Sequence, residues 1–165
     1  MSHAPSDALR RRHAQVRRDL AAASLDALVV TSLPSITYLT NFTGSTAIVV
    51  LTGDRLVFLT DSRYTTAMAE TRGTPSECPD LDLVVVEGSY DVSLARVLAE
   101  RGPTQVGVEA AHLTLSRFRW LDAKLRDLAS APTLVPTEGV VESARLVKDA
   151  YEIDVFREAG RRLSR

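Results

Sequence analysis

The chain has 165 residues, of which 45% are hydrophobic and 25% are charged, and its formal net charge is -1. This length suits one domain with a short extension, and the composition is that of a globular protein with a sizeable core. The balanced charge argues against a nucleic-acid partner, and the longest apolar run, 47–51, is far too short to span a membrane.

An amphipathic helix is expected at the start of the chain, over residues 7–23, with Ser6 as its N-cap. Leu9, Val16 and Leu20 recur at helical spacing and are expected to pack on the core. The other face carries a run of arginines without interleaved aromatic residues, which predicts a solvated surface rather than a nucleic-acid contact. These arginines are Arg10, Arg11, Arg12, Arg17 and Arg18.

Short apolar strands then alternate with helical segments. The expected strands are 25–31, 46–51, 55–59, 81–86, 105–108 and 133–135. The expected helices are a short turn at 34–39, a segment from Asp61 to about residue 72, a helix over 91–101, and a helix over 115–128 capped by Thr114. The spacing of strands 46–51 and 55–59 predicts a β-hairpin. The inner face of the 91–101 helix is expected to carry Val92, Leu94, Ala95 and Leu98.

This alternation predicts the fold class. Strands such as 81–86 are almost continuously apolar, which is typical of strands buried on both faces. We therefore expect an α/β fold, a three-layer domain with a mixed, mostly parallel sheet that is flanked by helices and antiparallel at the hairpin.

The last segment predicts one more helix. Asp149 is placed as its N-cap, and Glu152 three residues later completes a capping box. Ile153, Phe156 and Leu163 then fall on one face, together with Ala159. We expect residues 1–140 to form the α/β domain, and 141–165 to be a linker and the first helix of a further domain. The apolar face predicts a cover, either a neighbouring copy or a folded-back segment.

The chain shows few signs of catalytic chemistry of its own. Its single cysteine, Cys78, excludes an intramolecular disulfide, suits a reducing cytoplasm and has no neighbouring His or Lys to activate it. His3, His13 and His112 have no second ligand at metal-binding spacing. No nucleophile elbow and no glycine-rich phosphate loop occurs in the sequence.

Several segments together resemble a known family. They are Tyr38-Leu39-Thr40-Asn41-Phe42-Thr43-Gly44-Ser45, Thr60-Asp61-Ser62-Arg63-Tyr64, Val106-Gly107-Val108-Glu109 and the closing Arg145…Lys148…Glu152. Because these segments occur together and in this order, the chain resembles the N-terminal domain of the creatinase, prolidase and Xaa-Pro aminopeptidase metallopeptidases over nearly its whole length. The resemblance implies a ribonuclease-H-like layer structure, followed by a separate "pita-bread" catalytic domain.

The resemblance also implies a function. In the family, two divalent metal ions (Mn, Co or Zn) are held in the catalytic domain by two Asp, one His and two Glu, none of which can be placed here. We therefore expect no cofactor and no catalytic residue in this chain, which would be inactive alone. It would be the N-terminal domain of a cytoplasmic, homodimeric Xaa-Pro aminopeptidase or Xaa-Pro dipeptidase, acting on peptides with proline at the second position.

The implied role of such a domain is to support dimerisation and to narrow access to the partner's active site. The candidate residues are Phe42 with the turn at 41–45, then Arg63 and Tyr64. Arg63 offers a fork of donors to a carboxylate or carbonyl group, and the aromatic rings offer flat apolar walls.

Structural roles remain open for the same residues. Asp61 would cap its helix, Arg63 would pair with Asp61 or Glu70, and Tyr64 would be a core residue. An alternative function is a metal-free peptide- or protein-binding module of the same fold. A doubly wound nucleotide-binding module would need a phosphate loop, which the sequence lacks.

Overall fold

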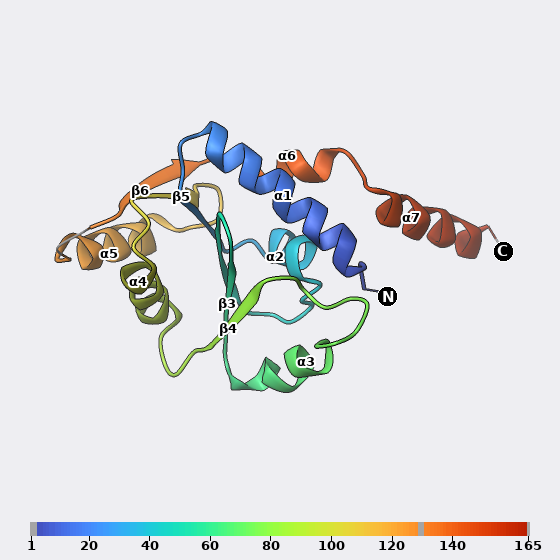
Figure 1. Cartoon of the computed structure of the whole chain (residues 1–165), viewed down its shortest axis with the longest axis horizontal. Helices are drawn as coiled ribbons and strands as arrows, with labels where there is room; N and C mark the ends of the chain where they lie inside the picture. The colour runs from blue at the N-terminus through green and yellow to red at the C-terminus, as the bar shows by residue number, and fades with distance from the viewer. Residues whose placement is uncertain (1–2, 129–130, 165) are drawn as a thin grey trace.

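A computed structural model describes residues 3–128 and 131–164, which form one six-stranded sheet with helices on both faces (Figure 1). The strands are β1 (Ala27–Val30), β2 (Ile48–Thr52), β3 (Leu56–Thr60), β4 (Leu81–Val85), β5 (Gln105–Glu109) and β6 (Thr133–Thr137). The helices are α1 (Ser6–Ala22), α2 (Leu33–Thr40), the 3₁₀ turn η1 (Ser62–Tyr64), α3 (Thr65–Glu70), α4 (Tyr90–Arg101), α5 (Leu115–Arg126), α6 (Val140–Leu146) and α7 (Ala150–Leu163).

The strand order in the sheet is β4-β3-β2-β1-β5-β6. β2 runs antiparallel to both of its neighbours, β1 and β3, whereas the β1–β5, β3–β4 and β5–β6 pairs are parallel. The expected mixed, mostly parallel sheet and the hairpin are therefore confirmed. Since β2 alone is reversed, the carboxyl ends of the other five strands lie at the same edge of the sheet.

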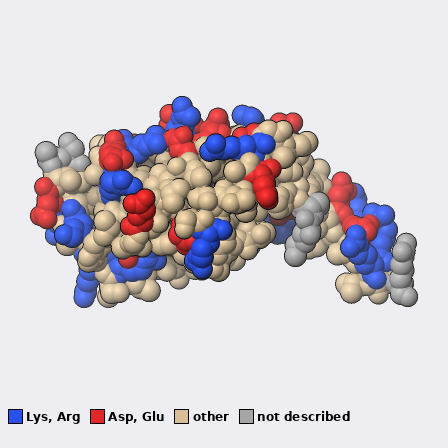
Figure 2. All heavy atoms as spheres, turned by 90° about the horizontal axis from the view of Figure 1, so that it is seen from below, with Lys and Arg blue, Asp and Glu red and all other residues tan. Residues whose placement is uncertain are grey.

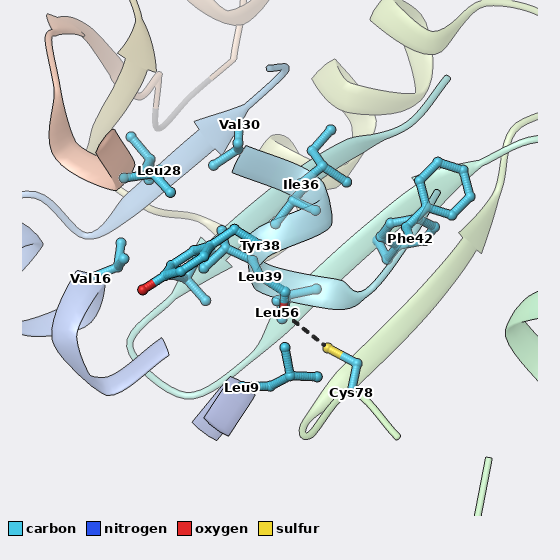
Figure 3. Packing of buried hydrophobic residues seen from close by; sticks show 14 of the residues in the cluster. Leu9, Val16, Leu28, Val30, Ile36, Tyr38, Leu39, Phe42, Leu56 and Cys78 are labelled. Atoms are coloured by element: carbon cyan, nitrogen blue, oxygen red, sulfur yellow. Dashed lines mark hydrogen bonds between the residues drawn. The ribbon is translucent and has the colours of Figure 1, made fainter. Parts of the chain in front are cut away.

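The two faces of the sheet form two cores. Alternate strand residues point to opposite faces, so Leu28 and Phe58 pack with α1, α2 and α6, while Val29 and Val57 pack with α4 and α5. Figure 3 shows part of the first of these cores, to which Leu9 and Val16 from α1 and Ile36 and Leu39 from α2 belong. The predicted three-layer domain is confirmed.

Burial differs from the expectation at two elements. The 81–86 segment was expected to be buried on both faces, but β4 is an edge strand of half-buried residues, and Val85 is 40% exposed. In α4, Val92 is 56% exposed, so its predicted place on the inner face is wrong. Ser93 and Val97 are buried instead, beside Leu94 and Leu98.

Most of the predicted helix caps are confirmed, with one exception. Asp61, Thr114 and Asp149 each accept a backbone N–H of the first turn, and Asp149 and Glu152 form the complete capping box. The Ser6 cap is wrong, because Pro5 occupies the N-cap position without a side-chain bond. The Ser6 hydroxyl instead donates to the carbonyl of Glu77 at 2.7 Å.

The arginine-rich face of α1 is also less solvated than expected. Leu9, Val16 and Leu20 are buried as predicted, but so is Arg12, whose side chain is only 6% exposed. On the face shown in Figure 2, Lys and Arg lie among Asp and Glu, with no large patch of one sign. Within the described ranges, no helix is long and apolar enough to cross a membrane.

α7 stands out from the body of the domain (Figures 1 and 2). None of its described residues is buried, and its predicted apolar face is exposed, with Ile153 at 40%, Phe156 at 63% and Leu163 at 88%. The division into residues 1–140 and 141–165 remains a prediction.

Candidate functional site

The carboxyl edge of the sheet gathers polar side chains from several elements. Ligands of open α/β sheets bind at this edge, because loops from neighbouring strands converge there. In this chain the edge carries Asp61 and Tyr64 after β3, Tyr90 after β4 and Glu109 at the end of β5. The reversed strand β2 begins here, so the turn at 41–45 reaches the same edge.

The turn begins where α2 ends. Asn41 takes the left-handed conformation with φ 64°, and its side chain bonds to both backbone groups of Ala4, accepting at 2.9 Å and donating at 2.8 Å. Next, Phe42 is 6% exposed and packs edge-on against Phe58 and Tyr64, each with ring centroids 5.0 Å apart. Phe42 therefore lies under the turn, at the border of the core (Figure 3).

Gly44 closes the turn over the Phe42 and Tyr64 rings. A Cβ at this position would overlap the Phe42 ring and lie 2.6 Å from Cε1 of Tyr64. Beside it, Ser45 donates its N–H to the Tyr64 hydroxyl at 3.2 Å, and the two hydroxyl groups are 2.9 Å apart. These bonds from Ser45 lower the pKa of Tyr64. Tyr64 thus joins the turn to the end of η1.

Arg63 forms a local ion pair with Asp61, one of the structural roles left open above. Its Nε and one amino group donate to the two Asp61 oxygens at 2.8 and 2.9 Å. Tyr90 donates to Asp61 Oδ2 at 2.8 Å. The bonds from Arg63, and then from Tyr90, hold the pKa of Asp61 well below its usual range. The Arg63 side chain remains 65% exposed, with its guanidinium carbon 5.3 Å from the Tyr64 ring centroid.

The structure therefore brings Phe42, Arg63 and Tyr64 into one cluster, which we call the edge cluster together with Asp61 and Ser45. Its base is aromatic and buried, and its outer surface presents a guanidinium and hydroxyl groups. Such a surface can bind carbonyl or carboxylate groups. Phe42 does not line that outer surface but supports Tyr64, which does.

Sequence reasoning missed two side chains at this edge. Tyr90 was not singled out, although its place at the carboxyl end of a strand predicts that it reaches the edge. Glu109 is 7% exposed, and its Oε2 accepts the N–H groups of Thr31 and Ser32 at 2.6 and 2.8 Å. Glu109 thereby fixes the junction between β1 and α2, and α2 in turn leads to the 41–45 turn.

Two further residues of reactive types, Cys78 and His13, are buried. Cys78 is buried, and burial raises the pKa of its thiol to about 12, so it is not a nucleophile. His13 is fully buried, its Nε2 lies 2.7 Å from the Leu39 carbonyl, and burial lowers its pKa to about 4. Within residues 3–128 and 131–164, no three His, Cys, Asp or Glu side chains gather as a metal-binding set. These residues do not fit a dinuclear metal centre.

Comparison with known proteins identifies one family model and several related peptidases that match this chain. The family model described as creatinase/prolidase N-terminal domain matches residues 12–147. The uncharacterized peptidase YqhT of Bacillus subtilis strain 168 is 28% identical over 148 residues, which are 89% of this chain. The chain spans only 39% of the length of that relative.

Among the solved structures that share the fold, two illustrate the match. The N-terminal domain of the cytoplasmic peptidase PepQ from Mycobacterium tuberculosis H37Rv matches with a TM-score of 0.69 at 29% identity, covering 81% of this chain and 98% of that one. The Xaa-Pro dipeptidase from Bacillus anthracis matches with a TM-score of 0.78 at 26% identity. That match covers 91% of this chain and 39% of the dipeptidase.

Proposed function

The chain belongs to the creatinase/prolidase N-terminal domain family, and from this premise we propose that it is the non-catalytic N-terminal domain of an Xaa-Pro aminopeptidase or Xaa-Pro dipeptidase. The observation that carries the proposal is the extent of the matches. The chain aligns with nearly all of a peptidase N-terminal domain and with 39% of an Xaa-Pro dipeptidase.

In this proposal, hydrolysis takes place in a further domain that α7 leads into. That domain would hold two divalent metal ions, manganese, cobalt or zinc, which activate a water molecule for attack on the peptide bond. The residues described here supply no such ligand set. The substrate would be a peptide with proline at the second position. A cytoplasmic location is supported by the name of the M. tuberculosis relative and by the single buried cysteine.

The contribution of this domain would be dimerisation and gating. The edge cluster would face the catalytic cleft of the partner subunit in a homodimer. Arg63 would meet a carboxylate or carbonyl group there, because its guanidinium is exposed yet held in one direction by Asp61. Tyr64 would form a wall of the entrance, and Phe42 would hold Tyr64 in place.

Kinetics of the complete gene product test the gating role. We expect Arg63→Ala to lower kcat/KM for Xaa-Pro peptides about tenfold while leaving the metal content and the melting temperature unchanged. Arg55→Ala is the matched control, since Arg55 is also about half exposed but lies in the β2–β3 turn, at the opposite edge of the sheet. Equal kcat/KM values for the two variants would contradict a gating role for Arg63.

The metal-free binding module remains the alternative function. It would be supported if the complete gene product bound no divalent metal but bound proline-containing peptides. The exposed hydroxyl and guanidinium groups of the edge cluster would then serve as the binding surface itself.

A further inference from the structure

Arg12 is a buried charged residue that is not part of the edge cluster. Its side chain is 6% exposed, although it belongs to the arginine-rich face of α1. A buried guanidinium is tolerated only when it is paired and hydrogen-bonded, so its partners show what it does. All the partners described for it lie outside α1.

The guanidinium of Arg12 meets the end of α2 and the start of α7. One amino group donates to the Tyr38 carbonyl at 2.8 Å, and the guanidinium carbon lies 4.3 Å from the Tyr38 ring centroid. Its Nε and the other amino group both contact Asp149 Oδ2 at 2.8 Å, and the latter amino group is 3.7 Å from Glu152. We call Arg12, Tyr38, Asp149 and Glu152 the Arg12 junction.

Asp149 has two separate tasks in this junction. Its Oδ1 accepts the Glu152 N–H at 2.9 Å and so caps α7, while its Oδ2 faces Arg12. Glu152 completes the capping box by accepting the Asp149 N–H at 3.1 Å. The first turn of α7 is therefore formed by its own residues, and Arg12 ties that formed turn to the domain. Loss of Arg12 would leave the helix intact but remove this charged link to the domain.

Beside Arg12, the described contact of α7 with the domain is Tyr151 in its first turn, which packs against the core and whose ring centroid lies 5.9 Å from the Arg12 guanidinium carbon. Leu146 and Val147, just before it, are 76% and 81% exposed, and none of the described α7 residues is buried. An open groove lined by Pro5, Tyr151, Val155 and Ala159 separates the helix from the start of the chain. Figure 1 shows α7 extending beyond the N-terminal end of α1.

We infer that Arg12 is a positioning residue that sets the direction in which α7 leaves the α/β domain. Tyr38 strengthens this arrangement, because its hydroxyl donates to the Ala144 carbonyl in α6 at 3.2 Å and so connects the junction to the element before α7. The inference rests on the proposed function only in its last step. If α7 leads into a catalytic domain, Arg12 also sets the angle between the two domains.

Distance measurements between spin labels test the inference on this chain without any catalytic assay. Labels attached at Ala14→Cys in α1 and Arg161→Cys in α7 lie on exposed positions, and the native Cys78 is buried and stays unlabelled. We expect one narrow distance distribution in the labelled parent. Arg12→Lys keeps the charge but loses the planar fork, and it should at least double the width of the distribution. Arg10→Lys, at an exposed position of the same helix, should leave the width unchanged.

Asp149→Asn provides a second variant in case the Arg12 variant does not fold. Asparagine keeps the helix cap but removes the charge that faces Arg12. A broadened distribution with unchanged helix content by circular dichroism is the expected result. A distance distribution with the same mean and the same width as that of the parent would overturn the inference. A broad distribution in the parent itself would also overturn it. Neither result depends on whether the complete gene product hydrolyses peptides.

Discussion

At the scale of single residues, Gly44 shows how tightly the edge cluster is built. Because a Cβ there would overlap the Phe42 ring and approach Tyr64, Gly44→Ala should force one ring out of place. We expect a loss of about 1–3 kcal/mol in the free energy of unfolding, measured by urea denaturation. Gly53→Ala is the control, since nothing lies within 4 Å of its added Cβ. Equal stability of the two variants would show that the turn adapts freely.

His13 gives the stability of the domain a predictable pH dependence. Burial lowers the pKa of His13 from 6.5 to about 4. Between pH 6.5 and pH 4, His13 is therefore protonated in the unfolded chain but not in the folded domain. The stabilisation is complete above about pH 6.5 and is lost progressively as the pH falls towards 4. It amounts to at most roughly 3.5 kcal/mol, since each pKa unit corresponds to about 1.4 kcal/mol.

A comparison of two glutamine variants checks this dependence. His13→Gln should flatten the fall in unfolding free energy between pH 6.5 and 4, whatever its stability at neutral pH. His112→Gln should leave the fall as it is in the parent, because His112 is exposed. An unchanged slope in His13→Gln would mean that His13 accepts a proton in the folded state.

At the scale of elements, Glu109 joins three of them. Glu109 is the last residue of β5, and its carboxylate accepts hydrogen bonds from two backbone N–H groups at the β1–α2 junction. Glu109→Ala would leave both donors unpaired, so we expect the unfolding free energy to fall by about 3 kcal/mol in denaturant titrations. Glu87→Ala removes the same charge from an exposed position and should change stability by less than about 0.5 kcal/mol. A small effect at Glu109 would mean that water replaces the carboxylate.

The elements also show what the sequence can predict. Caps at Asp61, Thr114 and Asp149, and the hairpin at 46–59, depend on local chemistry and are confirmed. Strand order is a long-range property, so the apolar 81–86 segment gave no sign that β4 lies at an edge. The same limit applies to Arg12, because its partners Tyr38 and Asp149 are 26 and 137 positions away in the chain.

The candidate site was also predictable only in part, because some of its contacts are local in the sequence and others depend on long-range strand pairing. The resemblance selected Phe42, Arg63 and Tyr64, and the fold brings these three together. The pairing of Arg63 with Asp61 was foreseen as one of two local options, because the residues are two positions apart. Tyr90 joins Asp61 only through the parallel pairing of β3 and β4, which single-sequence reasoning did not supply.

At the scale of the whole molecule, the edge cluster and α7 are two distinct regions of the structure. The edge cluster lies at the carboxyl edge of the sheet, whereas α7 extends beyond the N-terminal end of α1 (Figure 1) and is linked to α1 at the Arg12 junction. In the proposed peptidase, the first region would meet the partner subunit and the second would carry the catalytic domain. A non-catalytic domain would thus influence hydrolysis in two ways, by shaping the entrance and by holding the domains at a fixed angle.

The most direct test of the central claim is an Xaa-Pro peptide hydrolysis assay with added manganese or cobalt, run on this chain and on the complete product of its gene. We predict activity only in the complete product, together with about two bound metal ions per subunit. Hydrolysis by the 165-residue chain itself would contradict the claim that this domain is non-catalytic. A complete product without metal and without activity would contradict its assignment to a peptidase.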